Sequence, residues 1–434
     1  MKLWQKEHTA VSAAIEKFTV GRDREFDLQL APFDVMGSIA HVTMLGETGL
    51  MSKADADKAV KGLQDIAADI AAGRFVIEDG VEDVHSQVEL LLTRHIGEAG
   101  KMIHSGRSRN DQVATDIKLY LRHEVTEMRD LVKELFDMLL GLSEKHKGKL
   151  LPGYTHLQVG MPSSAGLWLG AYAESLVDDL EMLAAAHAVV DKNPLGSGAG
   201  YGSSFPLDRK RTTQLLSFAT LNWNSVYAQM SRGKSEKLVA MALASIATTL
   251  ARLSMDCCLY LNQDFAFISF PDELTTGSSI MPHKKNPDVF ELVRGKCNRI
   301  QSTSNELALL TTNLPSGYHR EMQLTKEVLF PAIGDLKDCL NILQIMFPAM
   351  TVRDNILDAD KYKYIFSVES VNELVNQGIP FREAYKEVGN RIAAGTFKYD
   401  ASKGLHHTHE GSIGNLCTED IRNEMEKVLR KFAH

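Results

Sequence analysis

The chain has 434 residues, of which 44% are hydrophobic and 24% charged, and its formal net charge at pH 7 is −8. This composition is typical of a soluble globular protein and excludes a disordered or fibrous one, while the length predicts two or three domains. The negative net charge argues against a nucleic-acid partner, so a small anionic substrate would need a local basic site.

Neither a leader nor a membrane span is predicted. The first 18 residues include Lys2, Lys6, Glu7 and Glu16 and have no continuous apolar core, which argues against a signal peptide. No stretch approaches the ~18 uninterrupted apolar residues of a membrane span. The five cysteines form no CxxC pair, and an odd number of cysteines in a long chain favours reduced thiols. We therefore expect a cytoplasmic protein.

Three regions follow one another along the chain. Residues 1–106 contain short segments separated by glycines and predict an N-terminal helical domain. Residues 107–350 hold most of the long proline-free stretches, and these suit long helices because proline inside a helix costs about 3 kcal/mol. Residues 351–434 return to short, glycine-containing pieces and predict a C-terminal helical domain.

The central region also has helical periodicity. Apolar residues recur at alternating steps of four and three from Leu121 to Leu142 and again from Val239 to Leu261, and a third apolar run covers 167–190. This spacing keeps one stripe of each helix facing a partner helix. The sequence therefore predicts an all-α chain of three domains, whose long central helices form an oligomeric bundle. A monomeric three-helix bundle is the alternative.

The densest group of polar residues lies between Gly277 and Asp288. Two hydroxyls and two lysines occur within a dozen residues, and Asn286-Pro287 predicts a helix start with Asn286 as the N-cap. Lys284 and Asn286 would then lie where free backbone N–H groups and the helix dipole favour an anion. The alternative is a flexible surface loop that merely caps a helix.

Three further polar segments interrupt the helical pattern. Residues 104–112 open the first long helix, where Asn110 or Asp111 can act as the cap and two arginines can bind carboxylates. Residues 153–158 form the turn after that helix and contain a histidine, His156, although a lone histidine is more often structural than catalytic. The fourth segment, residues 318–326, spaces Tyr318, Gln323 and Lys326 along one side of a predicted helix, which alone fits a solvated face equally well.

Together these segments resemble the fumarase/aspartase superfamily, whose shared loop GSSxMPxKxNP is matched by residues 277–287. The sequences HSGRSRNDQ at 104–112 and GYTHLQ at 153–158 narrow the resemblance to argininosuccinate lyases and their relative delta crystallin. Further agreement is found at residues 82–85, 194–196 and 378–384, so the resemblance covers nearly the whole chain.

This resemblance implies a homotetramer with a central helical bundle, in which segments of three subunits build each active site. The expected reaction is β-elimination of argininosuccinate to arginine and fumarate through a carbanion, in arginine biosynthesis. Ser278 corresponds to the catalytic serine, Lys284 and Asn286 to groups that stabilise the carbanion, and His156 to the histidine on the acid side, which Glu291 orients. The matched substrate-binding positions are Asp27, Ser108, Arg109, Asn110, Thr155, Gln158, Tyr318, Gln323 and Lys326.

The reaction explains why these residue types are required. Removing a weakly acidic proton beside a carboxylate creates a dianion, which forms only where positive charge and N–H donors already face it. A serine hydroxyl needs activation by that field to act as a base, and an imidazole can protonate the leaving nitrogen at neutral pH. No metal or organic cofactor is required. The tract of His406, His407, His409 and Glu410 is not expected to bind a metal, because two of its histidines are adjacent and no cysteine is near.

Four departures from the family pattern leave the substrate open. Asp23 stands where the family has a serine, and residues 230–233 keep only the arginine of an SDRD segment. Leu324-Thr325 replaces an acidic pair, and the family's opening motif is reduced to residues 3–6. A sister lyase that acts on an N-substituted argininosuccinate or another succinyl adduct is therefore an alternative. A catalytically silent, crystallin-like structural protein is a third hypothesis, from a different functional class.

Overall fold

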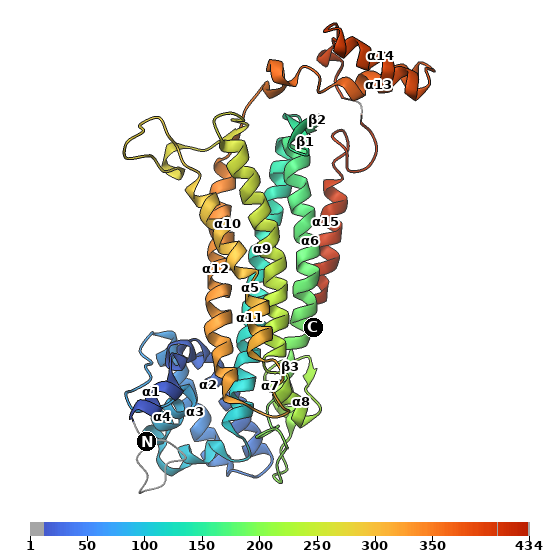
Figure 1. The fold of residues 1–434 in the computed structure, drawn as a ribbon. Coiled ribbons are helices and arrows are strands. Elements are labelled where there is room, and N and C mark those ends of the chain that lie inside the picture. Colours follow the sequence, from blue (N-terminus) through green and yellow to red (C-terminus); the bar gives the residue numbers. More distant parts are fainter. Residues whose placement is uncertain (1–12, 406, 433–434) are drawn as a thin grey trace.

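The computed structural model describes residues 13–405 and 407–432, and Figure 1 shows them as an elongated bundle of helices. The predicted all-α class with long central helices is confirmed. The first part of the chain lies at one end of the bundle, and the hairpin between the first two long helices lies at the other. Residues 3–6 and His406 fall outside the described residues.

The elements follow in chain order. The N-terminal part contains α1 (Ala13–Val20), α2 (Asp23–Glu47), α3 (Lys53–Ala71) and α4 (Val84–Ile96). The bundle contains α5 (Arg109–Lys145), α6 (Ala165–Val190), α9 (Lys234–Leu261), α10 (Asp288–Ile300), α11 (Thr303–Leu310) and α12 (Leu324–Met346). Two short helices, α7 (Arg209–Leu215) and α8 (Ser225–Met230), precede α9. The last part contains α13 (Ser367–Asn376), α14 (Phe381–Ala393) and α15 (Thr418–Leu429).

Strands are few and short in the described part of the chain. The antiparallel hairpin is formed by β1 (Leu150–Thr155) and β2 (Gln158–Ser164). A parallel pair joins β3 (Lys192–Asn193) to β4 (Thr220–Leu221), and an antiparallel pair joins β5 (Ile268–Ser269) to β6 (Thr351–Val352). The last two pairs fasten connecting segments and leave the helical core uninterrupted.

The predicted apolar stripes form the core of the bundle. On α5 the stripe residues from Val125 to Leu139 are at most 1% exposed, and the same holds on α9 for the stripe from Val239 to Leu253. Both stripes belong to one hydrophobic core that also includes residues of α6, α10 and α12. Helix α9 is long and apolar enough to cross a membrane, but 61% of its most apolar window is buried inside the protein, as in the core helix of a soluble protein.

The expectation of short segments in residues 1–106 is wrong for the first long element. Helix α2 has 25 residues and continues through Pro32. Proline lacks the N–H that would bond the carbonyl of Leu28, but Leu28 and Pro32 are both exposed, so this turn of the helix faces solvent, where water can bond a carbonyl instead. A proline on the solvent side of a helix therefore does not end it here.

The last part of the chain packs in two places. Helix α15 runs beside α6, and its residues Ile421, Met425 and Val428 join the bundle core. Helices α13 and α14 pack on each other around Val371 and Ala384 and lie beyond the hairpin end of the bundle.

The contact between α5 and α6 depends on a glycine. The hydroxyl of Ser143 donates a hydrogen bond of 2.6 Å to the carbonyl oxygen of Gly166. A Cβ atom on Gly166 would lie 2.6 Å from both the Cα atom of Lys147 and the carbonyl oxygen of Ser143. The two backbones are therefore too close for any side chain at this position.

We predict that Gly166→Ala lowers the free energy of unfolding by about 1–3 kcal/mol, the cost of overpacking. Gly141→Ala on α5 is the matched control, because a Cβ there meets nothing within 4 Å. The control should raise stability by about 0.5–1 kcal/mol, since alanine is the better helix former. Chemical denaturation followed by circular dichroism measures both changes, and equal effects at the two sites would contradict the packing argument.

Candidate active site

The start of α5 is fixed by a reciprocal pair of caps. Ser108 is the N-cap, since its hydroxyl accepts the backbone N–H of Asn110 at 3.3 Å, while Asp111 Oδ1 accepts the N–H of Ser108 at 2.8 Å. The prediction of Asn110 or Asp111 as the N-cap is therefore wrong by two or three residues, although Asp111 takes part in the capping box. Because the cap is Ser108, Arg109 and Asn110 occupy the first turn with their side chains free to line a cavity.

That cavity has a volume of about 150 Å³ and lies at the end of the bundle where α5 begins. It gathers six of the predicted substrate-binding residues, namely Asp27, Arg109, Asn110, Tyr318, Gln323 and Lys326. The sequence also placed the last three on one helix, which is wrong. Tyr318 precedes the short 3₁₀ turn Arg320–Gln323, and only Lys326 belongs to α12.

Two acidic residues before α4 line the same cavity and were not predicted as site residues. Arg109 Nη1 lies 3.2 Å from Glu82 Oε2 and 3.0 Å from Asp83 Oδ2, and Arg320 Nη2 lies 3.2 Å from Glu82 Oε1. Asp83 is also the N-cap of α4. The pair Glu82-Asp83 ahead of a helix start was the available signal, and it holds the two guanidinium groups at the cavity wall.

Lys326 lies at the buried side of the cavity between two carboxylates. It is only 2% exposed, its Nζ lies 2.6 Å from Asp23 Oδ1, and it also contacts Asp27 Oδ1. Burial lowers the pKa of Lys326, but the charges of Asp27 and Asp23 outweigh burial and raise it, so the lysine is positively charged at neutral pH. The positive charge of Lys326 is therefore already paired with two carboxylates of the protein when no substrate is bound.

A second layer of buried charges lies behind the cavity. His85 Nδ1 is 2.7 Å from Asp34 Oδ1 and 3.5 Å from Asp116 Oδ2. Although burial lowers the pKa of His85, the neighbouring carboxylates raise it to about 9. These three side chains are close enough to hold a metal ion, but the buried Arg107 and the protonated His85 already supply positive charge beside the aspartates, and burial raises the pKa of Asp116. We interpret the group as a structural ion network.

A neutral histidine lies next to this network. His41 is fully buried and its Nε2 lies 2.8 Å from the carbonyl oxygen of Ser105, so the ring donates a proton there. Burial and the charge of Arg107 lower the pKa of His41 to about 3. The bond fixes the segment that leads into Arg107 and the start of α5.

We predict an acid-dependent loss of stability that originates at His41. Its pKa is lower in the folded state than the ordinary value of 6.5, so its contribution is present above pH 6.5 and is lost as the pH falls towards 3. The loss should amount to about 1.4 kcal/mol per pH unit. Denaturation between pH 7 and 5 should show a shallower pH slope for His41→Gln, which keeps an N–H donor but does not titrate. Equal slopes would contradict the assignment.

His156 lies at the opposite end of the bundle, in the tip of the β1–β2 hairpin. Thr155 pairs with Gln158, and the two residues between them, His156 and Leu157, have φ of 54° and 58°. Such two-residue turns favour Asn-Gly, because other side chains are strained at positive φ by roughly 1–2 kcal/mol. Strain of this kind gathers at functional sites. His156 and Leu157 are both exposed, which supports a contact made outside this chain.

The loop from Thr276 to Pro287 lies at the same end of the bundle as the hairpin. The predicted N-cap role of Asn286 is wrong, because α10 begins at Asp288 with Pro287 as its N-cap. Asn286 is held instead across the loop, where its backbone N–H donates to the carbonyl of Thr276 at 2.8 Å and its amide donates to the carbonyl of Gly277 at 3.3 Å.

The reactive groups of this loop are accessible. The hydroxyl of Ser278 accepts the backbone N–H of Met281 at 3.2 Å, and Lys284 is exposed. Lys284, Asn286 and Glu291 line one hollow of about 670 Å³ beside the end of α9, whereas His156 lies on the hairpin. The structure thus groups the lysine, the asparagine and the glutamate.

The predicted site residues therefore form two groups at opposite ends of the molecule. Helix α5 has 37 residues, so its two ends are about 55 Å apart. Arg109 and its neighbours lie at one end, and the hairpin with His156 follows the other end. One chain does not bring these groups together.

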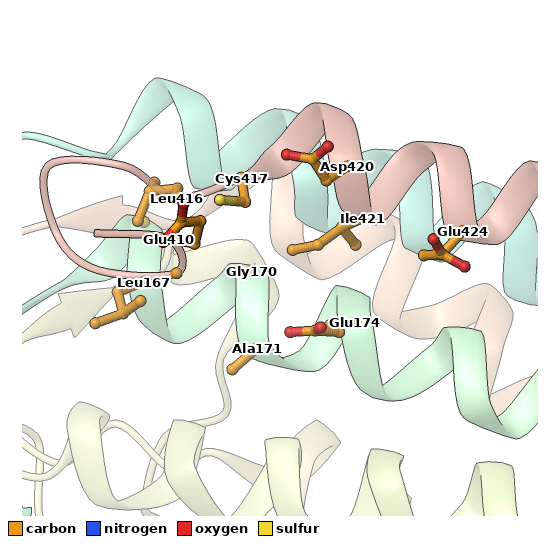
Figure 2. A pocket seen from close by; sticks show the side chains of 12 residues that line it. Leu167, Gly170, Ala171, Glu174, Glu410, Leu416, Cys417, Asp420, Ile421 and Glu424 are labelled. Carbon is orange, nitrogen blue, oxygen red and sulfur yellow. The ribbon is translucent and has the colours of Figure 1, made fainter. Parts of the chain in front are cut away.

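A further cavity, of about 530 Å³, lies between α6 and α15. Figure 2 shows the carboxylates of Glu174, Asp420 and Glu424 around it, and Glu410 lies nearby. No lysine, arginine or histidine lines this cavity, so its charge is unfavourable for an anionic substrate.

Comparison with known proteins decides the family. The model of a lyase family matches residues 6–302. The argininosuccinate lyase of Bacteroides fragilis is 57% identical over 99% of this chain and 96% of that protein. The chain belongs to the argininosuccinate lyase family. Two further relatives are also argininosuccinate lyases. That of Parabacteroides distasonis is 56% identical over 100% of this chain and 96% of that protein. That of Desulforamulus reducens is 41% identical over 90% of this chain and 85% of that protein.

Solved structures agree with the fold of this family. A variant of EDDS lyase with bound fumarate has a TM-score of 0.73 at 19% identity and covers 98% of this chain and 91% of that one. The class II fumarase of Schistosoma mansoni has a TM-score of 0.72 at 16% identity and covers 96% and 95%. At these identities the likeness concerns the fold alone.

Proposed function

We propose that the chain cleaves argininosuccinate into arginine and fumarate by β-elimination, as a step of arginine biosynthesis. The observation that carries this proposal is the nearly full-length identity of 55–57% with five argininosuccinate lyases. The cavity at the start of α5 adds chemical support, because it presents arginines and carboxylates together to a substrate that carries both charges.

The site residues have the following roles in this proposal. Ser278 removes the proton beside the carboxylate, and Lys284 and Asn286 stabilise the dianion that results. His156, which Glu291 orients, acts on the acid side of the reaction, where the leaving nitrogen gains a proton. The groups that hold the rest of the substrate are Asp27, Ser108, Arg109, Asn110, Thr155, Gln158, Tyr318, Gln323 and Lys326. The mechanism uses no metal or organic cofactor.

The proposal requires a homotetramer with shared active sites. A site that needs both Arg109 and Ser278 cannot form within one chain, because long helices separate them, whereas a second copy running in the opposite direction would place unlike ends together. Exposed apolar side chains on the bundle helices, including Leu292, Leu309 and Ile345, support burial against other copies. We place the enzyme in the cytoplasm, with a small-molecule substrate and neither a nucleic-acid nor a membrane partner.

A catalytically silent structural protein is less well supported. The turn at His156 and Leu157 carries backbone strain that glycine would relieve. A purely structural bundle gains nothing from strained residues at an exposed turn. The strain therefore favours an enzyme over a structural protein.

We predict that purified protein releases fumarate from argininosuccinate and that Ser278→Ala or His156→Ala lowers turnover by roughly 10²–10⁴-fold, as for a lost general acid or base. Fumarate is followed by its ultraviolet absorbance. Near-normal turnover in Ser278→Ala would refute its role as the base, and no turnover by the folded wild-type protein would refute the substrate.

Lys284 has a neighbouring lysine as its control. We predict that Lys284→Met lowers turnover by about 10²–10³-fold or more, the cost of one missing donor to a developing oxyanion. Lys285 is paired with Asp272 and is exposed, so Lys285→Met should change turnover little. Similar losses of turnover in the two variants would show that any loss of positive charge in this loop lowers activity. That result would contradict a specific role of Lys284.

Shared sites predict complementation between two inactive variants. Arg109→Gln and Ser278→Ala should each be nearly inactive alone, but mixed oligomers contain sites that draw both intact residues from different copies. With random mixing, about one quarter of native activity should return. The two variants are co-expressed with different tags and the mixed species is isolated by sequential affinity steps. No gain over the separate variants would contradict shared sites.

A further inference from the structure

The two aspartates that contact Lys326 differ in exposure and in the partners of their oxygen atoms. Asp27 is buried, with a side chain 3% exposed, and both of its oxygens have partners in the protein, since Oδ1 contacts Lys326 and Oδ2 accepts the backbone N–H of Val84 at 3.2 Å. Asp23 has a side chain 18% exposed, contacts Lys326 through Oδ1 and lines the cavity. Asp23 is therefore the carboxylate that a bound molecule can reach.

This cluster has an excess of negative charge. Asp23 and Asp27 together carry two negative charges against the one positive charge of Lys326. Burial and the charge of Asp27 raise the pKa of Asp23 to about 6, although Lys326 opposes them. A second cation beside Asp23 would remove this penalty, and the protein places no other lysine or arginine in contact with it among the described ion pairs.

The same cavity is also lined by two arginines, which are paired with the carboxylates of Glu82 and Asp83. Arg109 and Arg320 share the carboxylate of Glu82, and each offers a planar guanidinium group. The cavity of about 150 Å³ corresponds to roughly five water volumes, so it holds one end of a long substrate. A cavity that combines a negative cluster with two guanidinium groups suits a zwitterionic amino-acid head group, with its ammonium towards Asp23 and its carboxylate towards the arginines.

The other end of argininosuccinate does not suit this cavity. The succinyl half carries carboxylates without an ammonium, and Asp23 would repel them. The amine of the arginine half is the group that gains from Asp23, and an acylated amine has lost both the charge and two of its donors.

We infer that Asp23 is a specificity-determining residue that binds the free α-ammonium group of the arginine half, so that the enzyme requires an unmodified amine and rejects Nα-acylated argininosuccinate. This inference rests on the proposed function, and it selects the unmodified substrate over the N-substituted one. A site built around a charged donor discriminates strongly against an analogue that lacks it, because the excess negative charge around Asp23 is then not offset by a second cation.

The test compares Asp23→Asn with the wild-type enzyme on argininosuccinate and on Nα-acetyl-argininosuccinate. The wild type should prefer the unmodified substrate by about 100-fold or more in kcat/KM. Asp23→Asn should raise KM for argininosuccinate roughly 10–100-fold with kcat little changed, and should leave kcat/KM for the acetylated substrate nearly unaltered. Glu25→Gln, which removes an exposed carboxylate of the same helix outside the cavity, is the control and should retain the wild-type preference.

A merely structural role of Asp23 in holding Lys326 gives a different result. Both substrates would then lose kcat/KM in parallel, the preference would stay the same, and the inference would be overturned. Isothermal titration with L-arginine and Nα-acetyl-L-arginine separates this outcome from failure of the proposed function. Weaker binding of L-arginine alone in Asp23→Asn supports the amine site even if argininosuccinate is not cleaved, whereas equal binding by wild type and variant refutes it.

Discussion

Helix length is the constraint on which the rest of this structure depends. The core stripes of α5 and α9 require long, uninterrupted helices to pack, and the same length separates Arg109 from the segments that carry His156 and Ser278. Each end of the bundle therefore carries an incomplete set of chemical groups. Six of the predicted substrate-binding residues line the cavity at one end, and the predicted proton-transfer residues lie at the other end with Thr155 and Gln158. The proposed enzyme combines the two groups through self-association.

Buried charged and polar side chains hold the cavity at the start of α5 in place. The ion network of His85, Asp34 and Asp116 lies under the cavity, and the bond from His41 to Ser105 fixes the approach to α5. These groups cost free energy unless each is paired, so they hold the first turn of α5 in one register. A cavity of fixed charge, in which cations and carboxylates are already paired, is the result.

The sequence predicted the elements that depend on local rules. Apolar spacing gave the buried stripes of α5 and α9, because the faces of a helix follow from periodicity alone. The caps were harder, since the bond from Asp111 to Ser108 and the bridge between Thr276 and Asn286 shifted both helix starts. The short-segment expectation for residues 1–106 failed because nothing local reveals that Pro32 faces solvent.

The cavity could be predicted only in part. The family motifs supplied Arg109, Asn110 and Lys326, but the partners of Lys326 lie about 300 positions earlier in the chain, and no local pattern connects them. Arg320 was missed for the same reason, whereas Glu82 was missed although the acidic pair before α4 was a local signal. The grouping of Lys284 with Asn286 followed from their proximity in sequence, whereas the relation of His156 to either group depends on packing between copies and stays a prediction.

The long helices of the bundle also restrict how such a protein can change over time. Helices α5, α6 and α9 run between the same two ends of the molecule. Shortening one of them by a turn would therefore shift the segments attached to it by about 5.4 Å relative to the neighbouring helices. Insertions and deletions are therefore tolerated in the end segments, such as the connection between α14 and α15, and excluded from the helices between them. The long helices thus fix the distance between the two ends of the molecule, whatever side chains lie along them.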